Sequence, residues 1–181
     1  VILGKNKKIF DEVVICTGPW SKDFLSNLGY KIPLAWERGY HHHFSTKKDI
    51  DLSPAIHDVD GGFVYSCNKN EIRVTSGVEL NFREAVSNEE QINEVVQKLK
   101  IILPLKNKLT KTPWLGSRPT IADSLPMIGK APKHKNLWFN LGHNHIGLST
   151  SAGSGVILAD MIENKRTSIN VDPFLPERFT L

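Results

Sequence analysis

The stretch that decides the fold is GSRPTIADSLPMIG at residues 116–129, followed shortly by GHNHIGLS at residues 142–149. The first segment predicts a rigid turn that fixes Arg118, because glycine and proline lie close to that arginine. The second predicts a strand end, a glycine-flanked loop and a helix start, which would point backbone N–H groups at an anionic or electron-rich ligand. No Gly-x-Gly-x-x-Gly pattern follows a strand in this sequence. The sequence therefore predicts one half of a cofactor site, with the other half upstream.

Composition is that of an ordinary globular protein, because 40% of the 181 residues are hydrophobic and 23% are charged. No apolar run approaches the ~20 residues that span a bilayer. The sequence begins at Val1, inside what reads as a strand, so we expect a piece of a longer protein. Lysines cluster at residues 5–8 and 130–135, and the formal net charge is +4. Neither cluster contains interleaved aromatic residues, so we do not expect nucleic-acid binding.

The two cysteines, Cys16 and Cys67, form neither a disulfide framework nor a zinc motif. Cys16 ends the apolar run at residues 13–16, which predicts a buried free thiol. Free thiols fit a reducing compartment, so we expect a cytoplasmic protein.

The two ends of the chain have α/β character. A buried strand is predicted at residues 11–16, followed by a sharp turn and a short helix at 22–28 with Ser21 as its N-cap. A second strand is predicted at 136–141 and a helix at 148–164, while residues 173–179 read as an extended strap. Small residues early in the later helix predict the close approach of another backbone or a ligand.

The middle of the chain predicts a mainly antiparallel sheet with one helix. Short β-rich runs occupy residues 35–45, 62–67 and 71–80, with a hairpin turn at 68–70. Apolar residues at helical spacing follow residues 87–90 and stop before Pro104. We therefore expect an α+β and α/β fold with domains at 1–33, 34–115 and 116–181, the first and last belonging to one sheet domain.

Arg118 is the first candidate ligand-binding residue, because a guanidinium can hold a carboxylate through two parallel hydrogen bonds. A structural ion pair with Asp123 is the alternative. His143 and His145 are candidates for metal ligands, acid–base groups or simple loop donors. Asn144 lies between them at a position that favours positive φ.

His41-His42-His43 would place His41 and His43 on one face of a strand and His42 on the other. With at most two converging ligands, we do not expect a metal site. Tyr40 shares the face of His42 with Arg38, and either presents its hydroxyl to a substrate or packs against the sheet.

Four motifs in order resemble the FAD-dependent D-amino-acid oxidase superfamily, and most resemble its D-amino-acid dehydrogenase (small-subunit) type. These motifs are VVICTGPWS at 13–21, ERGYH at 37–41, the arginine segment at 116–129 and the loop at 142–149. The resemblance covers essentially the whole chain. It implies a Rossmann-like FAD domain and an antiparallel substrate domain, of which this chain is the C-terminal part, with the dinucleotide fingerprint in a missing N-terminal segment.

The resemblance also implies roles for individual residues. Arg118 would grip the carboxylate of a small amino-acid substrate, with Tyr40 and His145 as further substrate contacts. The implied cofactor contacts are Thr17, Gly18, Trp20, Gly142, His143, Asn144, His145, Ile146, Gly147, Leu148 and Ser149. Departures from the family pattern are Asn144 in place of glycine, Ser149 in place of threonine, and His42 and His43 in place of apolar residues.

The implied reaction is oxidative deamination of a D-amino acid by hydride transfer to FAD. No residue is a convincing general base, so positioning would supply most of the catalysis. Electrons would pass to a quinone, another carrier or oxygen, and a quinone-linked enzyme is compatible with peripheral association at the inner face of a membrane. Alternatives are oxidation of glycine, sarcosine or proline-like amines, or a non-catalytic assembly module.

Overall fold

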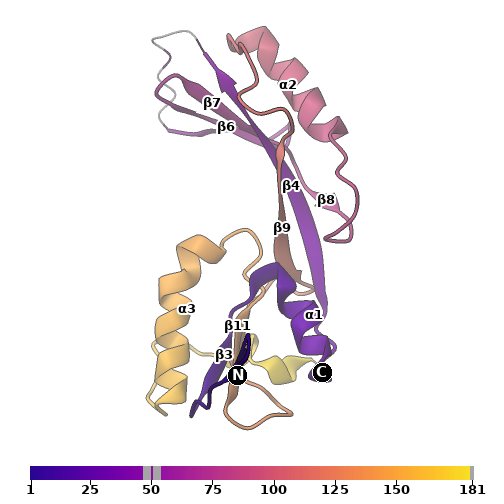
Figure 1. The fold of residues 1–181 in the computed structure, drawn as a ribbon. Helices are drawn as coiled ribbons and strands as arrows, with labels where there is room; N and C mark the ends of the chain where they lie inside the picture. Colours follow the sequence, from indigo (N-terminus) through magenta and orange to yellow (C-terminus); the bar gives the residue numbers. More distant parts are fainter. Residues whose placement is uncertain (47–49, 51–53, 180–181) are drawn as a thin grey trace. The chain divides into compact units, whose positions relative to one another are not determined.

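The chain, described here by a computed structural model covering residues 1–46, 50 and 54–179, divides into two compact units (Figure 1). We call Val1–Trp36 together with Arg118–Leu181 the terminal unit, and Glu37–Ser117 the central unit. The domain boundaries expected from the sequence lie after residue 33 and after residue 115. An α/β terminal unit and a mainly antiparallel central unit agree with the predicted fold class.

A three-stranded sheet in the order β10-β11-β3 forms the centre of the terminal unit. β3 (Val13–Ile15) runs parallel to β11 (Leu137–Leu141), while β10 (Met127–Lys130) runs antiparallel to β11. A hairpin of β1 (Ile2–Leu3) and β2 (Asn6–Lys7) precedes this sheet.

Side chains of β11 alternate between two helical layers. Leu137 and Phe139 join the core cluster that includes Leu25 of α1 (Ser21–Ser26). Trp138 packs instead with residues of α3 (Gly147–Ile162). Because both faces of the strand are covered, its sequence is almost continuously apolar.

Two predicted details around β3 are wrong. Ser21 is not an N-cap but the first residue of α1, because the 3₁₀ turn η1 (Gly18–Trp20) leads directly into the helix. Its side chain is buried, and its hydroxyl lies 3.0 Å from Thr17 Oγ1. Cys16 is an exposed free thiol rather than a buried one. β3 ends at Ile15 and lies at the edge of the described sheet, so the described residues leave Cys16 uncovered.

The C-terminal segment is also not an extended strap. It forms two 3₁₀ turns, η2 (Asp172–Phe174) and η3 (Pro176–Arg178). Each turn has a proline at one of its first two positions, where the fixed φ of proline suits a helical turn.

The central unit is built on a sheet in the order β5-β6-β7-β4-β8, and β9 also pairs with β4. The pairings β5–β6, β6–β7, β7–β4 and β4–β8 are all antiparallel. Its strands are β4 (Leu34–Ser45), β5 (Ile56–Asp58), β6 (Phe63–Asn68), β7 (Glu71–Thr75), β8 (Glu79–Leu80) and β9 (Trp114–Ile121). The predicted hairpin turn joins β6 to β7, and Lys69 within it has a φ of 58°.

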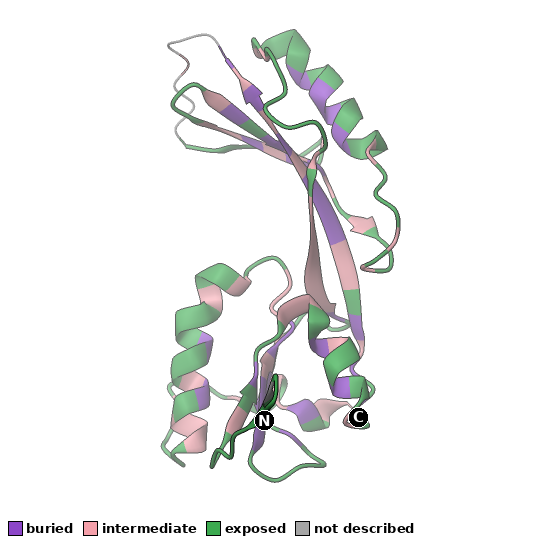
Figure 2. Ribbon diagram, viewed as in Figure 1, coloured by how far each residue is buried: buried purple, intermediate pink, exposed green. Residues whose placement is uncertain are grey.

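Helix α2 (Glu90–Ile102) covers one face of this sheet. Its buried residues Ile92, Val95, Val96 and Leu99 lie along one side of the helix (Figure 2). They pack in one cluster with sheet residues that include Tyr40, Phe44, Ile72 and Val74. The apolar spacing in the sequence predicted this helix. Within the described part of the chain, no helix has the length and apolar character needed to cross a membrane.

Arg38 is fully buried in the central unit and holds the β8–α2 segment against β4. Its guanidinium donates to the carbonyl oxygens of Phe82 at 3.2 Å and Val86 at 3.3 Å, and to the Tyr40 hydroxyl at 3.2 Å. Glu79 Oε2 lies 3.5 Å from Arg38 Nε. This network encloses a buried charge with one carboxylate and three oxygen acceptors.

The Tyr40 hydroxyl is fully engaged in the same network. It donates to Glu79 Oε2 at 2.6 Å and accepts from the Asn88 N–H at 2.9 Å. Burial raises the pKa of Tyr40, and the hydrogen bond to Glu79 raises it further. Burial alone would raise the pKa of Glu79, but the hydrogen bonds from Tyr40 and Asn81 and the charge of Arg38 leave it lowered. Tyr40 therefore contributes to the fold of the central unit, while its role as a substrate contact stays a prediction.

Replacing Arg38 by methionine should lower the free energy of unfolding by about 3 kcal/mol, because Glu79 and two carbonyls lose a buried partner. Urea denaturation measures the change. Arg73→Met is the matched control, because Arg73 is an exposed arginine of the same sheet, and its replacement should change stability by less than about 0.5 kcal/mol. Equal stability of the two variants would show that the Arg38 network contributes nothing.

Candidate functional site

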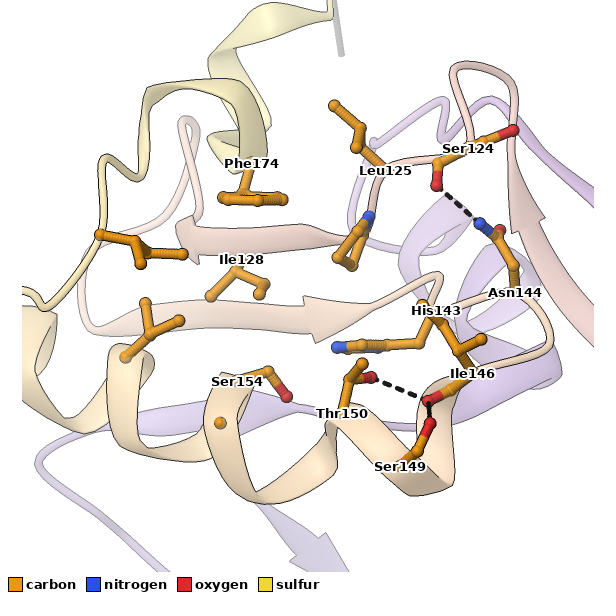
Figure 3. A pocket seen from close by; sticks show the side chains of 14 residues that line it. Ser124, Leu125, Ile128, His143, Asn144, Ile146, Ser149, Thr150, Ser154 and Phe174 are labelled. Atoms are coloured by element: carbon orange, nitrogen blue, oxygen red, sulfur yellow. Dashed lines mark hydrogen bonds between the residues drawn. The ribbon is translucent and has the colours of Figure 1, made fainter.

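The two sequence segments that decide the fold lie against each other in the terminal unit. The Asn144 N–H donates to the Pro119 carbonyl at 3.1 Å, and Thr120 forms an isolated antiparallel bridge with His143. The Asn144 side chain adds two bonds, since it accepts from the Ile121 N–H at 3.2 Å and donates to the Ser124 carbonyl at 2.7 Å. Figure 3 shows the second of these bonds. One asparagine therefore ties the loop at 142–146 to the end of β9 and to the turn that follows.

The predicted turn around Arg118 is wrong in its position. Arg118 lies within β9, which continues to Ile121, and the turn follows that strand, with Ser124 at a φ of 64°. Pro119 biases the preceding residue towards an extended backbone, and extended backbone here forms a strand. Arg118 itself is half-buried.

Gly142 and Asn144 give the loop its shape through positive φ angles of 76° and 51°. A Cβ atom on Gly142 would lie 2.3 Å from Ile121 Cγ1, so only glycine fits beside that side chain. The predicted positive φ of Asn144 is confirmed. Asparagine tolerates this conformation better than most residues, and here its amide also braces the loop.

The start of α3 faces the same loop. Ile146 is the N-cap residue, and its carbonyl accepts hydrogen bonds from the Ser149 and Thr150 hydroxyls, both at 2.9 Å. Within the described residues, no side chain caps this helix start, and its first turn contains no acidic residue. The first N–H groups and the positive end of the helix dipole can therefore serve an anionic or electron-rich ligand.

A second turn lies at the same end of the sheet, after the carboxyl end of β3. β3 and β11 run parallel, with Ile15 opposite Phe139. The segments that follow the two strands therefore leave from the same end of the sheet, where the carboxyl ends of both strands lie. The segment after β3 is the Thr17–Trp20 turn, in which Gly18 has a φ of 56° and Trp20 is 61% exposed. The Trp36 indole donates to the Pro19 carbonyl at 2.8 Å and holds this turn in place.

Asp123, the alternative partner of Arg118, forms an ion pair with Arg178. Arg178 Nε lies 2.7 Å from Asp123 Oδ2, and Nη2 lies 3.3 Å from Oδ1. The Leu125 N–H also donates to Asp123 Oδ1, at 3.0 Å. Sequence reasoning missed this pair because 55 residues separate its members and no local pattern joins them. The pair anchors the turn after β9 to the C-terminal 3₁₀ segment.

The structure separates the two histidines of the loop. His145 is exposed, whereas the His143 side chain is directed into a cavity of about 390 Å³ (Figure 3). His143 Nε2 is buried, and no hydrogen bond to it is found among residues 1–46, 50 and 54–179. Burial lowers the pKa of His143, so its imidazole is neutral near pH 7. No sequence pattern signalled the cavity, because α3, β10 and the C-terminal segment meet there only in the fold.

The three consecutive histidines lie in the central unit and alternate as predicted. The rings of His41 and His43 are 4.9 Å apart, and His41 stacks on Trp114 at 4.8 Å. His42 is fully buried and lies 5.7 Å from the Phe44 ring. Burial, reinforced by the charges of Arg73 and the other two histidines, lowers the pKa of His41 to about 4. Among the described residues, no three His, Cys, Asp or Glu side chains are grouped to hold a metal.

Comparison with known proteins gives a family pattern, sequence relatives and a shared fold. The pattern of the family described as FAD dependent oxidoreductase matches residues 2–161. A D-amino-acid oxidase from Bradyrhizobium diazoefficiens is 30% identical over 176 residues, which cover 93% of this chain and 41% of that protein. A D-amino acid dehydrogenase from Paramagnetospirillum magneticum is 27% identical over 176 residues, which cover 94% and 40% of the two chains.

A solved structure adds the fold. The glycine oxidase from Geobacillus kaustophilus matches with a TM-score of 0.77 at 20% identity, over 94% of this chain and 46% of the other. This chain therefore spans less than half the length of each of the three proteins.

Replacing Asn144 by alanine should lower the free energy of unfolding by about 3 kcal/mol, from ~1 kcal/mol per lost hydrogen bond and ~1 kcal/mol for alanine at positive φ. Asn144→Gly keeps the backbone conformation and should cost about 2 kcal/mol. Asn164→Ala, at a φ of 55° just after α3, is the control for the backbone cost alone. Urea denaturation that finds Asn144→Gly as stable as the parent would contradict the bracing role.

The Asp123–Arg178 pair predicts a specific pH dependence. The hydrogen bond from Arg178 lowers the pKa of Asp123 below its ordinary value of 3.8. A carboxylate with a lowered folded pKa stabilises the fold above its unfolded pKa, and this stability is lost as pH falls through the folded pKa. Asp123→Asn should therefore reduce stability at neutral pH and flatten the loss of stability below about pH 4.

Denaturation across a pH series measures that slope. Arg178→Met should partly flatten the same acid limb, because it removes the largest cause of the lowered pKa of Asp123 while the hydrogen bond from the Leu125 N–H remains. An unchanged acid limb in both variants would contradict the predicted contribution of this pair.

Proposed function

This chain belongs to the FAD dependent oxidoreductase family. We propose that it is part of an enzyme that oxidatively deaminates D-amino acids, and that it contributes the loop that contacts the flavin and the residues that bind the substrate. One observation carries the proposal. The uncapped start of α3 and the loop braced by Asn144 follow the carboxyl end of β11, and the Thr17–Trp20 turn follows the carboxyl end of the neighbouring parallel strand β3. The two D-amino-acid enzymes among the relatives support this substrate class.

The residues that follow the carboxyl ends of β3 and β11 fit an FAD cofactor. Gly142 packs closely against the Ile121 side chain and has a φ of 76°, which fixes the course of the loop that would face the flavin. The first N–H groups of α3 provide donors for the electron-rich N1–C2=O edge of a flavin, and no acid in the first turn competes with them. The proposed contacts are those named from the resemblance: Thr17, Gly18, Trp20 and residues 142–149.

Bound FAD supplies the hydride acceptor, while the chain supplies binding and orientation. We assign Arg118 to the substrate carboxylate, with His145 as a second contact. Arg118 directly precedes Pro119, whose carbonyl accepts the Asn144 N–H. The residue that grips the substrate and the loop that faces the cofactor thus share one braced segment. Such fixed geometry is how positioning accelerates a reaction that has no evident general base.

The proposed enzyme needs more than this chain. The chain spans 41% and 40% of the two relatives, and no dinucleotide fingerprint occurs in it. Within the described residues, β3 pairs on one side only, with β11. We propose that a segment carrying the fingerprint completes the sheet beside β3 and the cofactor site. The free thiols of Cys16 and Cys67 support a cytoplasmic location.

The test uses the whole protein that contains residues 1–181. Anaerobic D-alanine should bleach its flavin absorbance, and re-oxidation by air or by an added quinone then identifies the acceptor. Arg118→Met should raise the D-alanine concentration for half-reduction roughly 10- to 100-fold and leave the flavin content unchanged, because a charged hydrogen-bond pair contributes about 1.5–3 kcal/mol. Arg166→Met, at an exposed arginine beyond α3, is the control and should match the parent.

Three results would contradict the proposal. Reduction by glycine, sarcosine or proline but not D-alanine would move the enzyme to that substrate class. A protein without flavin would indicate an assembly module. An Arg118→Met variant with unchanged substrate dependence would remove Arg118 from the substrate site.

A further inference from the structure

We propose that Trp36 is a positioning residue for the flavin, because its indole N–H fixes the Thr17–Trp20 turn relative to the loop braced by Asn144. The inference rests on the proposed function, which places both segments against the FAD cofactor. Trp36 acts through the turn, and the turn supplies the cofactor contacts.

The Thr17–Trp20 turn has only short-range backbone bonds of the 3₁₀ type to shape it from within. The Trp20 N–H donates to the Thr17 carbonyl at 3.2 Å, and the Ser21 N–H donates to the Gly18 carbonyl. Bonds of this type have poorer geometry than those of an α-helix. Gly18 has a φ of 56°, and glycine there leaves the backbone many other conformations. A contact from outside the turn therefore contributes to its shape.

Trp36 provides that contact. Its Nε1–H donates to the Pro19 carbonyl at 2.8 Å, in the middle of the turn. The indole is itself held by two neighbours. The Lys22 ammonium lies 4.9 Å from the centroid of the indole ring and donates to the Leu34 carbonyl at 2.8 Å, and the ring packs against the core cluster that contains Leu34 and Leu25. The donor therefore has a fixed direction.

The strand that carries Trp36 is tied to the other flavin-facing segment. The Ala122 N–H, just after β9, donates to the Pro33 carbonyl, just before β4, at 3.1 Å. The preceding Ile121 N–H donates to Asn144 Oδ1 at 3.2 Å. Hydrogen bonds within the terminal unit thus connect the turn, through Trp36 and the start of β4, to the end of β9 and the loop at 142–146.

This connection has a consequence for cofactor affinity. FAD binds tightly only to those molecules in which the turn and the loop already have the required arrangement, so the apparent dissociation constant rises as that fraction falls. Trp36→Phe keeps an aromatic ring in the core and removes the N–H donor. The dissociation constant for FAD should rise about fivefold, which corresponds to the ~1 kcal/mol that one hydrogen bond contributes.

Trp138→Phe is the matched control. The Trp138 indole N–H donates to Glu12 Oε2 at 2.7 Å, near the amino ends of β3 and β11 and so at the opposite end of the sheet from the turn. Both variants lose one indole hydrogen bond of the terminal unit. Urea denaturation should therefore find comparable losses of stability, whereas flavin binding should weaken in Trp36→Phe alone.

The experiment uses the whole flavin-loaded protein that contains residues 1–181. Fluorescence anisotropy of the flavin over a dilution series gives the dissociation constant for FAD in the parent and in each variant. Lys22→Met, which frees the indole without changing it, should raise this constant about twofold. Saturating FAD should restore the D-alanine dependence of the parent in Trp36→Phe, because the variant weakens the turn and leaves Arg118 in place.

Equal retention of flavin by Trp36→Phe and Trp138→Phe would overturn the inference. A loss of flavin that follows the loss of stability in both variants would also overturn it, because Trp36 would then be a structural residue only. These results leave the proposed function intact as long as D-alanine bleaches the flavin of the parent. A parent that contains no flavin, or a flavin that D-alanine does not reduce, contradicts the proposed function itself.

Discussion

The side chain of Asn144 is the interaction on which the candidate site depends. Its amide joins three separate pieces of the terminal unit: the loop after β11, the end of β9 and the turn at Ser124. This bracing adds to the main-chain hydrogen bond from Asn144 to Pro119 and to the bridge between Thr120 and His143, and so fixes the loop against the strand that carries Arg118. Asparagine serves here twice, because it accepts a positive φ and supplies a donor and an acceptor at once.

Arg38 and His143 both place polar atoms in buried surroundings, but those surroundings differ. Three oxygen acceptors and the Glu79 carboxylate surround the Arg38 guanidinium, although its Nε makes no hydrogen bond with a described residue. His143 Nε2 has no such partner among the described residues and lies beside an apolar cavity. The hydrogen bonds of Arg38 hold the β8–α2 segment against β4, whereas His143 Nε2 keeps an unused hydrogen-bonding position beside the cavity.

Local patterns in the sequence predicted much of this fold. The hairpin at Asn68-Lys69-Asn70, helix α2 and the positive φ of Asn144 all follow from turn chemistry or apolar spacing over a few residues. The cavity and the Asp123–Arg178 pair could not be predicted, because they join segments far apart in the chain.

The wrong predictions have the same origin. The apolar run ending at Cys16 indicated burial, but β3 lies at the edge of the described sheet and ends one residue earlier. Glycine and proline around Arg118 indicated a turn, yet pairing with the rest of the fold extends β9 through both. Whether the local conformational preference of a segment prevails depends on which other segments pack against it in the fold, and the order of residues in the sequence does not show this directly.

The loop and the start of α3 offer their hydrogen-bond donors mainly from the main chain, and main-chain groups are the same for almost every amino acid. Natural selection can therefore replace most side chains around such a surface while its donors stay in place. The restrictions fall on backbone shape, at Gly142 and Asn144, rather than on chemical identity. This accounts physically for how proteins only 27–30% identical to this chain can retain one architecture through long evolutionary drift.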